Sequence, residues 1–198
     1  WAEETSPALA ELASHFRGDN GLYLCLDPIE GTERFVENAP YYSSIVSLHD
    51  GKQPLYSWIY YPKMPWWARF DEQGASFSGP GWPEERLGPE LAKTIVYTAG
   101  DPAKDCPDWK EKLEAEGYSF CKSREIGPYG AKYLLLREKV AGYFVARPNP
   151  YDGLLAYHCT QTRDTWDLWN DLPPQGFTHL EQDKRGFHYP IRYLALRR

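Results

Sequence analysis

The sequence predicts a layered α/β (α+β) sandwich with mixed sheets, formed as a single domain over residues 1–198. Two observations support this prediction. Hairpins dominate the first half of the chain, whereas strands and helices alternate in the second half, and this combination is typical of sheets packed against helices. The composition, 42% hydrophobic and 25% charged in 198 residues, is that of a globular chain long enough to bury one substantial core.

The first half is expected to begin with a helix and to continue as strands. Residues 6–18 predict an amphipathic helix, because Ser6 can cap its start, Gly18 can end it and its apolar residues recur at helical spacing. The β-rich segments that follow predict a buried strand over 21–27, a hairpin over 41–62 that turns at Asp50-Gly51, and a strand, turn and second strand over 65–79.

In the second half, strands alternate with helices. Strands are expected over 93–100, 118–123, 141–148 and, more weakly, 176–180, and helices over 106–117, 130–139 and 151–162. Lys132, Arg137 and Lys139 fit a polar face of the helix over 130–139. Arg34, which follows the segment described below, is interpreted as a solvated helix arginine.

Charge and cysteine usage exclude several classes of protein. The net charge of −6 argues against a general nucleic-acid-binding protein, because phosphate backbones need a basic face. No apolar run approaches the ~18 residues that a membrane-spanning helix needs. The four cysteines are scattered and form no CxxC pair, so we expect reduced core thiols and a cytoplasmic protein.

One polar stretch, LDPIEGTERF at residues 26–35, carries the candidate chemistry. Asp27 ends a strand, Pro28 interrupts the ladder, and Gly31 and Thr32 open a short helix whose amides could bind an anion. Acids beside an anion site need a cation between them, and carboxylate and carbonyl oxygens are the ligands that hard divalent ions prefer. The alternative is a plain turn in which Asp27 and Glu30 only cap the helix.

The same stretch opens a longer resemblance. Residues 26–62 resemble the first signature region of the inositol monophosphatase family, whose pattern is Asp-Pro-Ile/Leu-Asp-Gly-Thr followed by an aromatic residue and a hairpin. Upstream, WAEET at 1–5 resembles the family's Gly-Glu-Glu motif. Downstream, residues 127–157 resemble the stretch that ends in its Trp-Asp-x-x-Ala-Gly motif, with Asp152 at the third acidic ligand. The resemblance implies an α-β-α-β-α sandwich that lacks the N-terminal helices here.

The resemblance also implies an activity: a Mg²⁺-dependent phosphatase that hydrolyses a small phosphorylated metabolite with a metal-activated water. The substrate classes it suggests are an inositol phosphate, a nucleotide 3′-phosphate or a sugar phosphate. Two or three Mg²⁺ ions are implied, with Mn²⁺ as a substitute. The first ion would be held by Glu3, Asp27 and the Ile29 carbonyl, and the second by Asp27, Glu30 and Asp152.

The implied catalytic residues are Glu3, Glu30 and Thr32, with Glu3 and Thr32 orienting the attacking water. The Gly31 and Thr32 amides would bind the phosphate.

Several departures from the family pattern leave a second interpretation open. Glu30 stands where the family has an aspartate, and Tyr151 stands where the third motif has a tryptophan. The alternative is therefore a catalytically degenerate family member that acts as a binding or scaffold subunit. Without the N-terminal helices a large apolar face would be bare, so we expect a homodimer or another partner to cover it.

Overall fold

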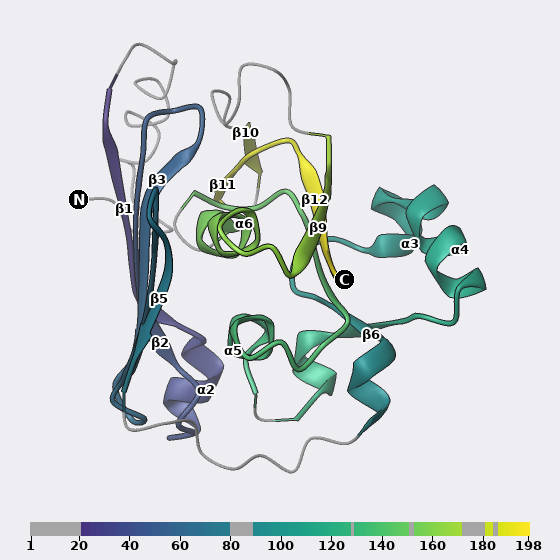
Figure 1. The fold of residues 1–198 in the computed structure, drawn as a ribbon, viewed down its shortest axis with the longest axis horizontal. Coiled ribbons are helices and arrows are strands. Elements are labelled where there is room, and N and C mark those ends of the chain that lie inside the picture. Colours follow the sequence, from purple (N-terminus) through teal and green to yellow (C-terminus); the bar gives the residue numbers. More distant parts are fainter. Residues whose placement is uncertain (1–20, 80–88, 128, 151–152, 172–180, 184–185) are drawn as a thin grey trace.

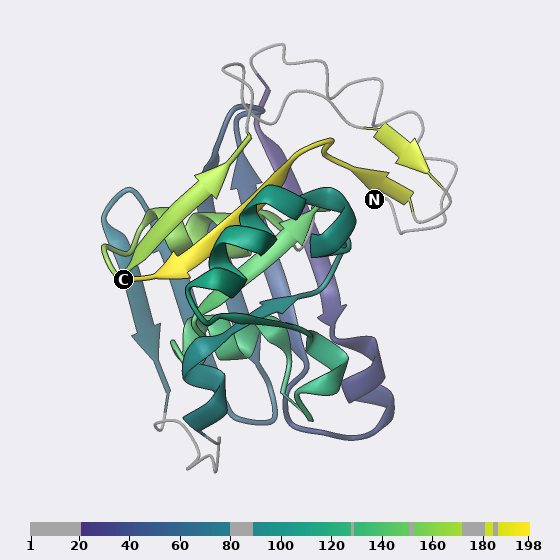
Figure 2. The same cartoon turned by 90° about the vertical axis from the view of Figure 1, so that its right-hand side faces the viewer.

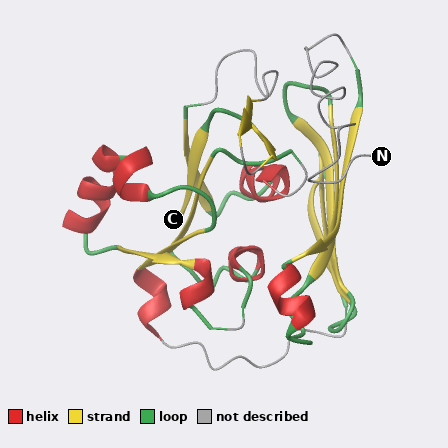
Figure 3. Ribbon diagram, turned by 180° about the vertical axis from the view of Figure 1, so that it is seen from behind, coloured by secondary structure: helices red, strands yellow, loops and turns green. Residues whose placement is uncertain are grey.

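Two β-sheets lie on either side of a pair of helices, and further helices cover the outer side of the second sheet (Figure 1). This arrangement is seen in a computed structural model that describes residues 21–79, 89–127, 129–150, 153–171, 181–183 and 186–198. The view from behind shows the same succession of sheet, helices and sheet (Figure 3). The predicted layered α/β fold is confirmed.

The first sheet is a five-stranded antiparallel meander. Its strands follow chain order: β1 (Tyr23–Glu30), β2 (Ser43–His49), β3 (Pro54–Tyr61), β4 (Trp66–Asp71) and β5 (Gly74–Ser78). The β2–β3 hairpin turns at Asp50-Gly51, where Asp50 Oδ1 accepts hydrogen bonds from the Lys52 and Gln53 amides. The predicted hairpin is therefore confirmed.

The second sheet is mixed. Its order is β7 (Ser119–Lys122), β6 (Thr94–Tyr97), β8 (Gly142–Ala146), β12 (Arg192–Arg197) and β9 (Trp166–Asn170). Strand β6 runs parallel to β7 and β8, whereas β12 is antiparallel to β8 and β9. A separate two-stranded ribbon joins β10 (Glu181–Asp183) to β11 (Gly186–His188).

Helices fill the interior and cover one outside face. Between the sheets lie α5 (Ala131–Leu136) and α6 (Gly153–Gln161), and on the far side of the second sheet lie α3 (Pro102–Asp105) and α4 (Pro107–Ala115) (Figure 2). The short α2 (Thr32–Val36) follows β1, and two 3₁₀ turns, η1 (Pro89–Lys93) and η2 (Ser123–Glu125), complete the described elements. No helix in the described ranges is long and apolar enough to cross a membrane.

The interior helices are buried on all sides. Every residue of α5 is buried, and in α6 only Gln161 at its end is exposed. A helix that is apolar all round needs cover on both faces, and the two sheets provide it. The inward side chains of the first sheet, Ile45, Ile59, Ala68 and Phe70, are fully buried against these helices.

The strand predicted over 21–27 is present, but the prediction that it is buried is wrong. In β1 the side chains alternate, so that Tyr23, Cys25 and Asp27 face inward while Leu24 on the outer face is 71% exposed. An apolar run in a strand buries only the face that meets another layer. The helix predicted over 6–18 and the strand predicted over 176–180 lie outside the described residues.

A chain of polar groups crosses this otherwise apolar interior. Ser47 and Ser57 share a hydrogen bond at 3.2 Å, and Ser57 Oγ lies 3.0 Å from Nδ1 of His158 on α6. Burial lowers the pKa of His158 to about 4. His49, at the edge of the same sheet, is fully buried, and burial lowers its pKa to about 4 as well.

These histidines predict a loss of stability in mild acid. The unfolded chain binds a proton near pH 6.5 and the folded chain only near pH 4, so below pH 6.5 the unfolded state binds more protons and folding stability falls as pH falls. Each histidine contributes a slope of up to about 1.4 kcal/mol per pH unit in this window. Urea unfolding between pH 7.5 and 5 should show a shallower decline for His158→Gln than for the wild type. Equal slopes would contradict the assignment.

Candidate metal and phosphate site

The acidic turn is shaped by a break in the ladder between β1 and β2. Asp27 pairs with Ile45 and Glu30 with Ser43, and the register shifts between these pairs. Pro28, at the shift, has no N–H to donate. The Asp27 carboxylate accepts a hydrogen bond at 3.0 Å from the Ile29 amide, which holds it beside the turn. The predicted interruption at Pro28 is therefore confirmed.

The turn then passes directly into α2. Gly31, the residue before the helix, has φ of +84° and ψ of +49°, a left-handed conformation that glycine adopts without strain. A Cβ at Gly31 would make only ordinary contacts with Tyr41 and Tyr42, so backbone conformation and not space requires the glycine. Thr32 Oγ1 donates to the Ile29 carbonyl at 3.3 Å. The predicted short helix that opens at Gly31 and Thr32 is confirmed.

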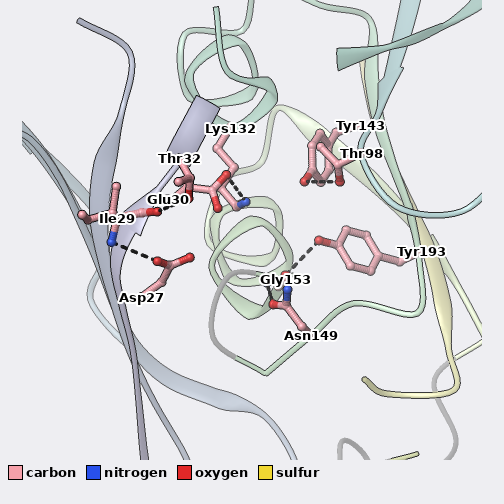
Figure 4. Close-up of polar contacts among 10 residues, drawn as sticks. All are labelled: Asp27, Ile29, Glu30, Thr32, Thr98, Lys132, Tyr143, Asn149, Gly153 and Tyr193. Atoms are coloured by element: carbon pink, nitrogen blue, oxygen red, sulfur yellow. Dashed lines mark hydrogen bonds and ion pairs between the residues drawn. The ribbon is translucent and has the colours of Figure 1, made fainter. Parts of the chain in front are cut away.

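The strongest contact of the turn is an ion pair with a distant helix. Nζ of Lys132, in the first turn of α5, lies 2.8 Å from Oε1 of Glu30 (Figure 4). The Lys132 side chain is 3% exposed and that of Glu30 is 26% exposed. The prediction that Lys132 belongs to a polar helix face is therefore wrong, because α5 has no solvent-facing side. A buried ammonium needs a paired charge, and Glu30 supplies it.

The hydroxyl of Tyr61, the last residue of β3, is affected by the charges of the same ion pair. Its side chain is 1% exposed, and burial is the main reason that the pKa of its hydroxyl is raised. The Glu30 carboxylate raises this pKa further, whereas the Lys132 ammonium lowers it. The ion pair is therefore close to the aromatic core, where its field is weakly screened.

Arg34 also connects the turn to the chain before α5. Its guanidinium bonds the Glu37 carboxylate at 3.0 Å and donates to the Gly127 carbonyl at 3.1 Å. The side chain is 13% exposed, so the prediction of a solvated arginine is wrong. Because Arg34 and Lys132 both bridge to the α5 region, α2 and the acidic turn are held at two points.

The start of α6 faces the turn across the interior. The Gly153 amide donates to the side-chain oxygen of Asn149 at 3.3 Å, and Tyr193 donates to the Gly153 carbonyl at 2.9 Å. A Cβ at Gly153 would lie 2.3 Å from the Pro148 Cβ, so only glycine fits this approach. The close-up places Asp27 and Glu30 on one side and Asn149 and Gly153 on the other (Figure 4).

Sequence reasoning missed Asn149 and Tyr193. Asn149 lies four residues before the start of α6, so the capping pattern of a helix start does not mark it. Nothing local marks Tyr193, which reaches Gly153 from a strand 40 residues later in the chain.

The structure brings together five of the predicted site residues and leaves two undescribed. Asp27, Ile29, Glu30, Gly31 and Thr32 lie on the one turn. Glu3 and Asp152 lie outside the described residues. Within the part of the chain that is described, no three histidine, cysteine, aspartate or glutamate side chains are grouped closely enough to hold a metal ion. The roles assigned to the seven residues therefore stay predictions.

The donor chemistry fits a first divalent ion. Asp27 offers a carboxylate, and Ile29 offers a carbonyl whose position is fixed by the Thr32 hydroxyl at 3.3 Å. Oxygen donors of these two kinds are the ligands that Mg²⁺ prefers, and Glu3 is the predicted further ligand.

The second predicted ion position does not fit. Mg²⁺ on the Glu30 oxygen that binds Lys132 would lie within about 5 Å of the ammonium. A repulsion on the order of 7 kcal/mol results at an effective dielectric constant of about 20. Moving the lysine away would instead leave a buried charge without its partner, which costs roughly 3–5 kcal/mol.

Together, the layers and the acidic turn define a layered α/β protein with a candidate oxyanion and cation site at the edge of its antiparallel sheet. The family model for inositol monophosphatases matches residues 2–154. This chain belongs to the inositol monophosphatase family.

Solved structures share the fold at low sequence identity. CysQ from Bacteroides thetaiotaomicron matches with a TM-score of 0.60 and 15% identity, over 94% of this chain and 73% of that one. Staphylococcal IMPase-II gives 0.58 and 15% over 90% and 68%, and inositol monophosphatase from Zymomonas mobilis gives 0.55 and 17% over 91% and 67%. The chain thus spans about two-thirds of their length. A comparison with curated proteins finds no match.

The ion pair predicts energetic coupling between Glu30 and Lys132. Lys132→Met should lower the free energy of unfolding by about 3–5 kcal/mol, because the Glu30 carboxylate loses its partner. The double variant Glu30→Gln/Lys132→Met should recover part of that loss, with a coupling energy of roughly 1–3 kcal/mol in a double-mutant cycle. Additive losses in urea unfolding would show that the two side chains do not interact.

Proposed function

We propose that the protein is a Mg²⁺-dependent phosphomonoesterase that acts on a small phosphorylated metabolite. The observation that carries this proposal is the acidic turn, where the Asp27 carboxylate accepts from the Ile29 amide and the Thr32 hydroxyl donates to the Ile29 carbonyl within one chain reversal. Membership of the inositol monophosphatase family supports the same reaction class.

Each residue of the turn has a role in this proposal. Asp27 and the Ile29 carbonyl hold the ion together with Glu3, and Asp152 is the proposed third acidic ligand. Bound Mg²⁺ supplies an activated water and neutralises charge on the transferred phosphoryl group. Thr32, whose hydroxyl is 3.3 Å from the Ile29 carbonyl, orients the water with Glu3, and the Gly31 and Thr32 amides bind phosphate oxygens.

The substrate is proposed to be a soluble phosphate monoester. The related SaIMPase-II has been solved with inositol monophosphate bound and also with 2′-AMP bound, so one protein of this fold accepts both kinds of ligand. An inositol phosphate and a nucleotide phosphate are therefore classes to assay first. The family resemblance adds a nucleotide 3′-phosphate and a sugar phosphate to the panel.

Phosphate release from a panel of these monoesters should depend on Mg²⁺ and on Asp27. Asp27→Asn should lower kcat/KM by about 100-fold or more, because the metal provides several kcal/mol of charge stabilisation in the transition state. Asp108→Asn, an exposed acid in the first turn of α4, is the matched control and should keep wild-type activity. Absence of Mg²⁺-dependent release from every substrate would contradict the proposal.

A second role is favoured by the outer face of the first sheet. Leu24 and Leu26 of β1 are exposed on this face, as is Leu22 just before the strand, and the half-buried Val46 and Trp58 continue the face across β2 and β3. Large exposed apolar patches mark interaction surfaces. We propose that a second copy of the chain covers this face, since a self-complementary apolar patch suits a two-fold dimer.

The dimer can be tested by light scattering after size-exclusion chromatography. The wild type should elute at about twice its mass of 22.9 kDa, and Leu24→Lys should shift it to the monomer because a charge would be buried at the interface. Val36→Lys is the control, because Val36 is equally exposed but lies on α2. A monomeric wild type would contradict the dimer and point to another partner for this face.

A further inference from the structure

The ion pair at Glu30 bears on how many metal ions the site binds, an inference that rests on the proposed function. We infer that Lys132 supplies, as a permanent part of the chain, the positive charge at Glu30, so that the site binds a single divalent ion on the Asp27 side and none at Glu30. Lys132 thereby takes the place of the second ion that Glu30 was predicted to hold.

The first step is the contact itself. The ammonium and the Glu30 carboxylate are 2.8 Å apart, a short charge-assisted hydrogen bond, although 102 residues separate them in the chain. Glu30 ends β1 and Lys132 lies in the first turn of α5, so both are held by regular elements. The pair therefore belongs to the folded frame and is not a chance meeting of two flexible surface side chains.

The Lys132 side chain is buried in a helix whose other residues are apolar. Lys132 is the only charged residue of α5, and its neighbours in that helix are Ala131, Tyr133 and three leucines, all buried. A desolvated ammonium is stable only beside a negative group. A divalent ion at the Glu30 oxygen that Lys132 contacts would have to displace the ammonium.

The identity of residue 30 is consistent with this pairing. The family pattern has an aspartate at this position, and the extra methylene of Glu30 extends its carboxylate towards α5. The glutamate and the lysine therefore act as a matched pair, in which the side chain that departs from the family pattern is the one that meets the internal cation.

The remaining oxygens keep an ion on the other side of the turn. Asp27 is oriented by the Ile29 amide at 3.0 Å, and the Ile29 carbonyl accepts from Thr32 Oγ1 at 3.3 Å. The inference predicts a site for one metal ion. The charge of the second ion is replaced by the Lys132 ammonium, which is present at every Mg²⁺ concentration.

Mn²⁺ binding measured by calorimetry and by electron paramagnetic resonance tests this inference. The wild type should bind one Mn²⁺ with an uncoupled six-line spectrum, and Asp27→Asn should raise its Kd at least about tenfold. Lys132→Met, which frees the Glu30 carboxylate, should bind a second Mn²⁺ and show a spin-coupled pair.

The double variant Glu30→Gln/Lys132→Met keeps the net charge of the site and is the matched control. It should bind one Mn²⁺ with a Kd within about threefold of the wild type, because neither altered side chain is a ligand. Circular dichroism checks the fold of each variant, and this double variant keeps the test informative if Lys132→Met does not fold.

Two results would overturn the inference, and only the second would also contradict the proposed phosphatase function. Two coupled Mn²⁺ ions in the wild type, reduced to one in the double variant, would show that Glu30 is a ligand, while the proposed phosphatase function would stand. Absence of Mn²⁺ binding in the wild type and in Lys132→Met would overturn both this inference and the metal-dependent function.

Discussion

The whole structure depends on the burial of two helices that have no polar face. Because α5 and α6 are enclosed by sheets on both sides, any charged group that they carry must find its counter-charge inside the protein. Lys132 is such a group, and Glu30 is its counter-charge. This requirement fixes where β1 ends relative to α5, and with it the position of the acidic turn against the start of α6.

The turn itself follows from three consecutive local constraints. Pro28 cannot donate to the ladder, so pairing lapses there and resumes at Glu30. Gly31 then takes a left-handed conformation that reverses the chain into α2. Within this short path the Ile29 amide donates to the Asp27 carboxylate and the Thr32 hydroxyl donates to the Ile29 carbonyl, so both contacts are local and do not depend on distant packing.

Local pattern was sufficient to predict features of this kind. The β2–β3 hairpin, the break at Pro28 and the start of α2 at Thr32 were all predicted from turn chemistry, because their causes lie within a few residues. Strand β1 was predicted, but its exposed outer face was not, since an apolar run does not reveal which layers are present on each side of it. No strand was predicted where β9 forms, because its strand character comes from pairing with β12.

Long-range partners could not be predicted from the sequence. Lys132, Arg137 and Lys139 have the spacing of a polar helix face, and only tertiary structure shows that the first of them points into the protein towards a residue 102 positions earlier. The same holds for Arg34, whose carbonyl partner at Gly127 is 93 positions later. Both mistaken assignments concern cations beside the acidic turn, which is where buried charge makes pattern-based reasoning weakest.

These two cations give the site an electrostatic asymmetry. Arg34 satisfies Glu37 and the Gly127 carbonyl on the outer side of α2, and Lys132 satisfies Glu30 on the inner side, so both extremes of the turn are already neutralised by the protein. Asp27, on β1, lies on the opposite side of the site from Asn149 and Gly153 (Figure 4). A dication is repelled where an ammonium already lies. The Lys132 ammonium therefore disfavours an added ion at the Glu30 oxygen that it contacts.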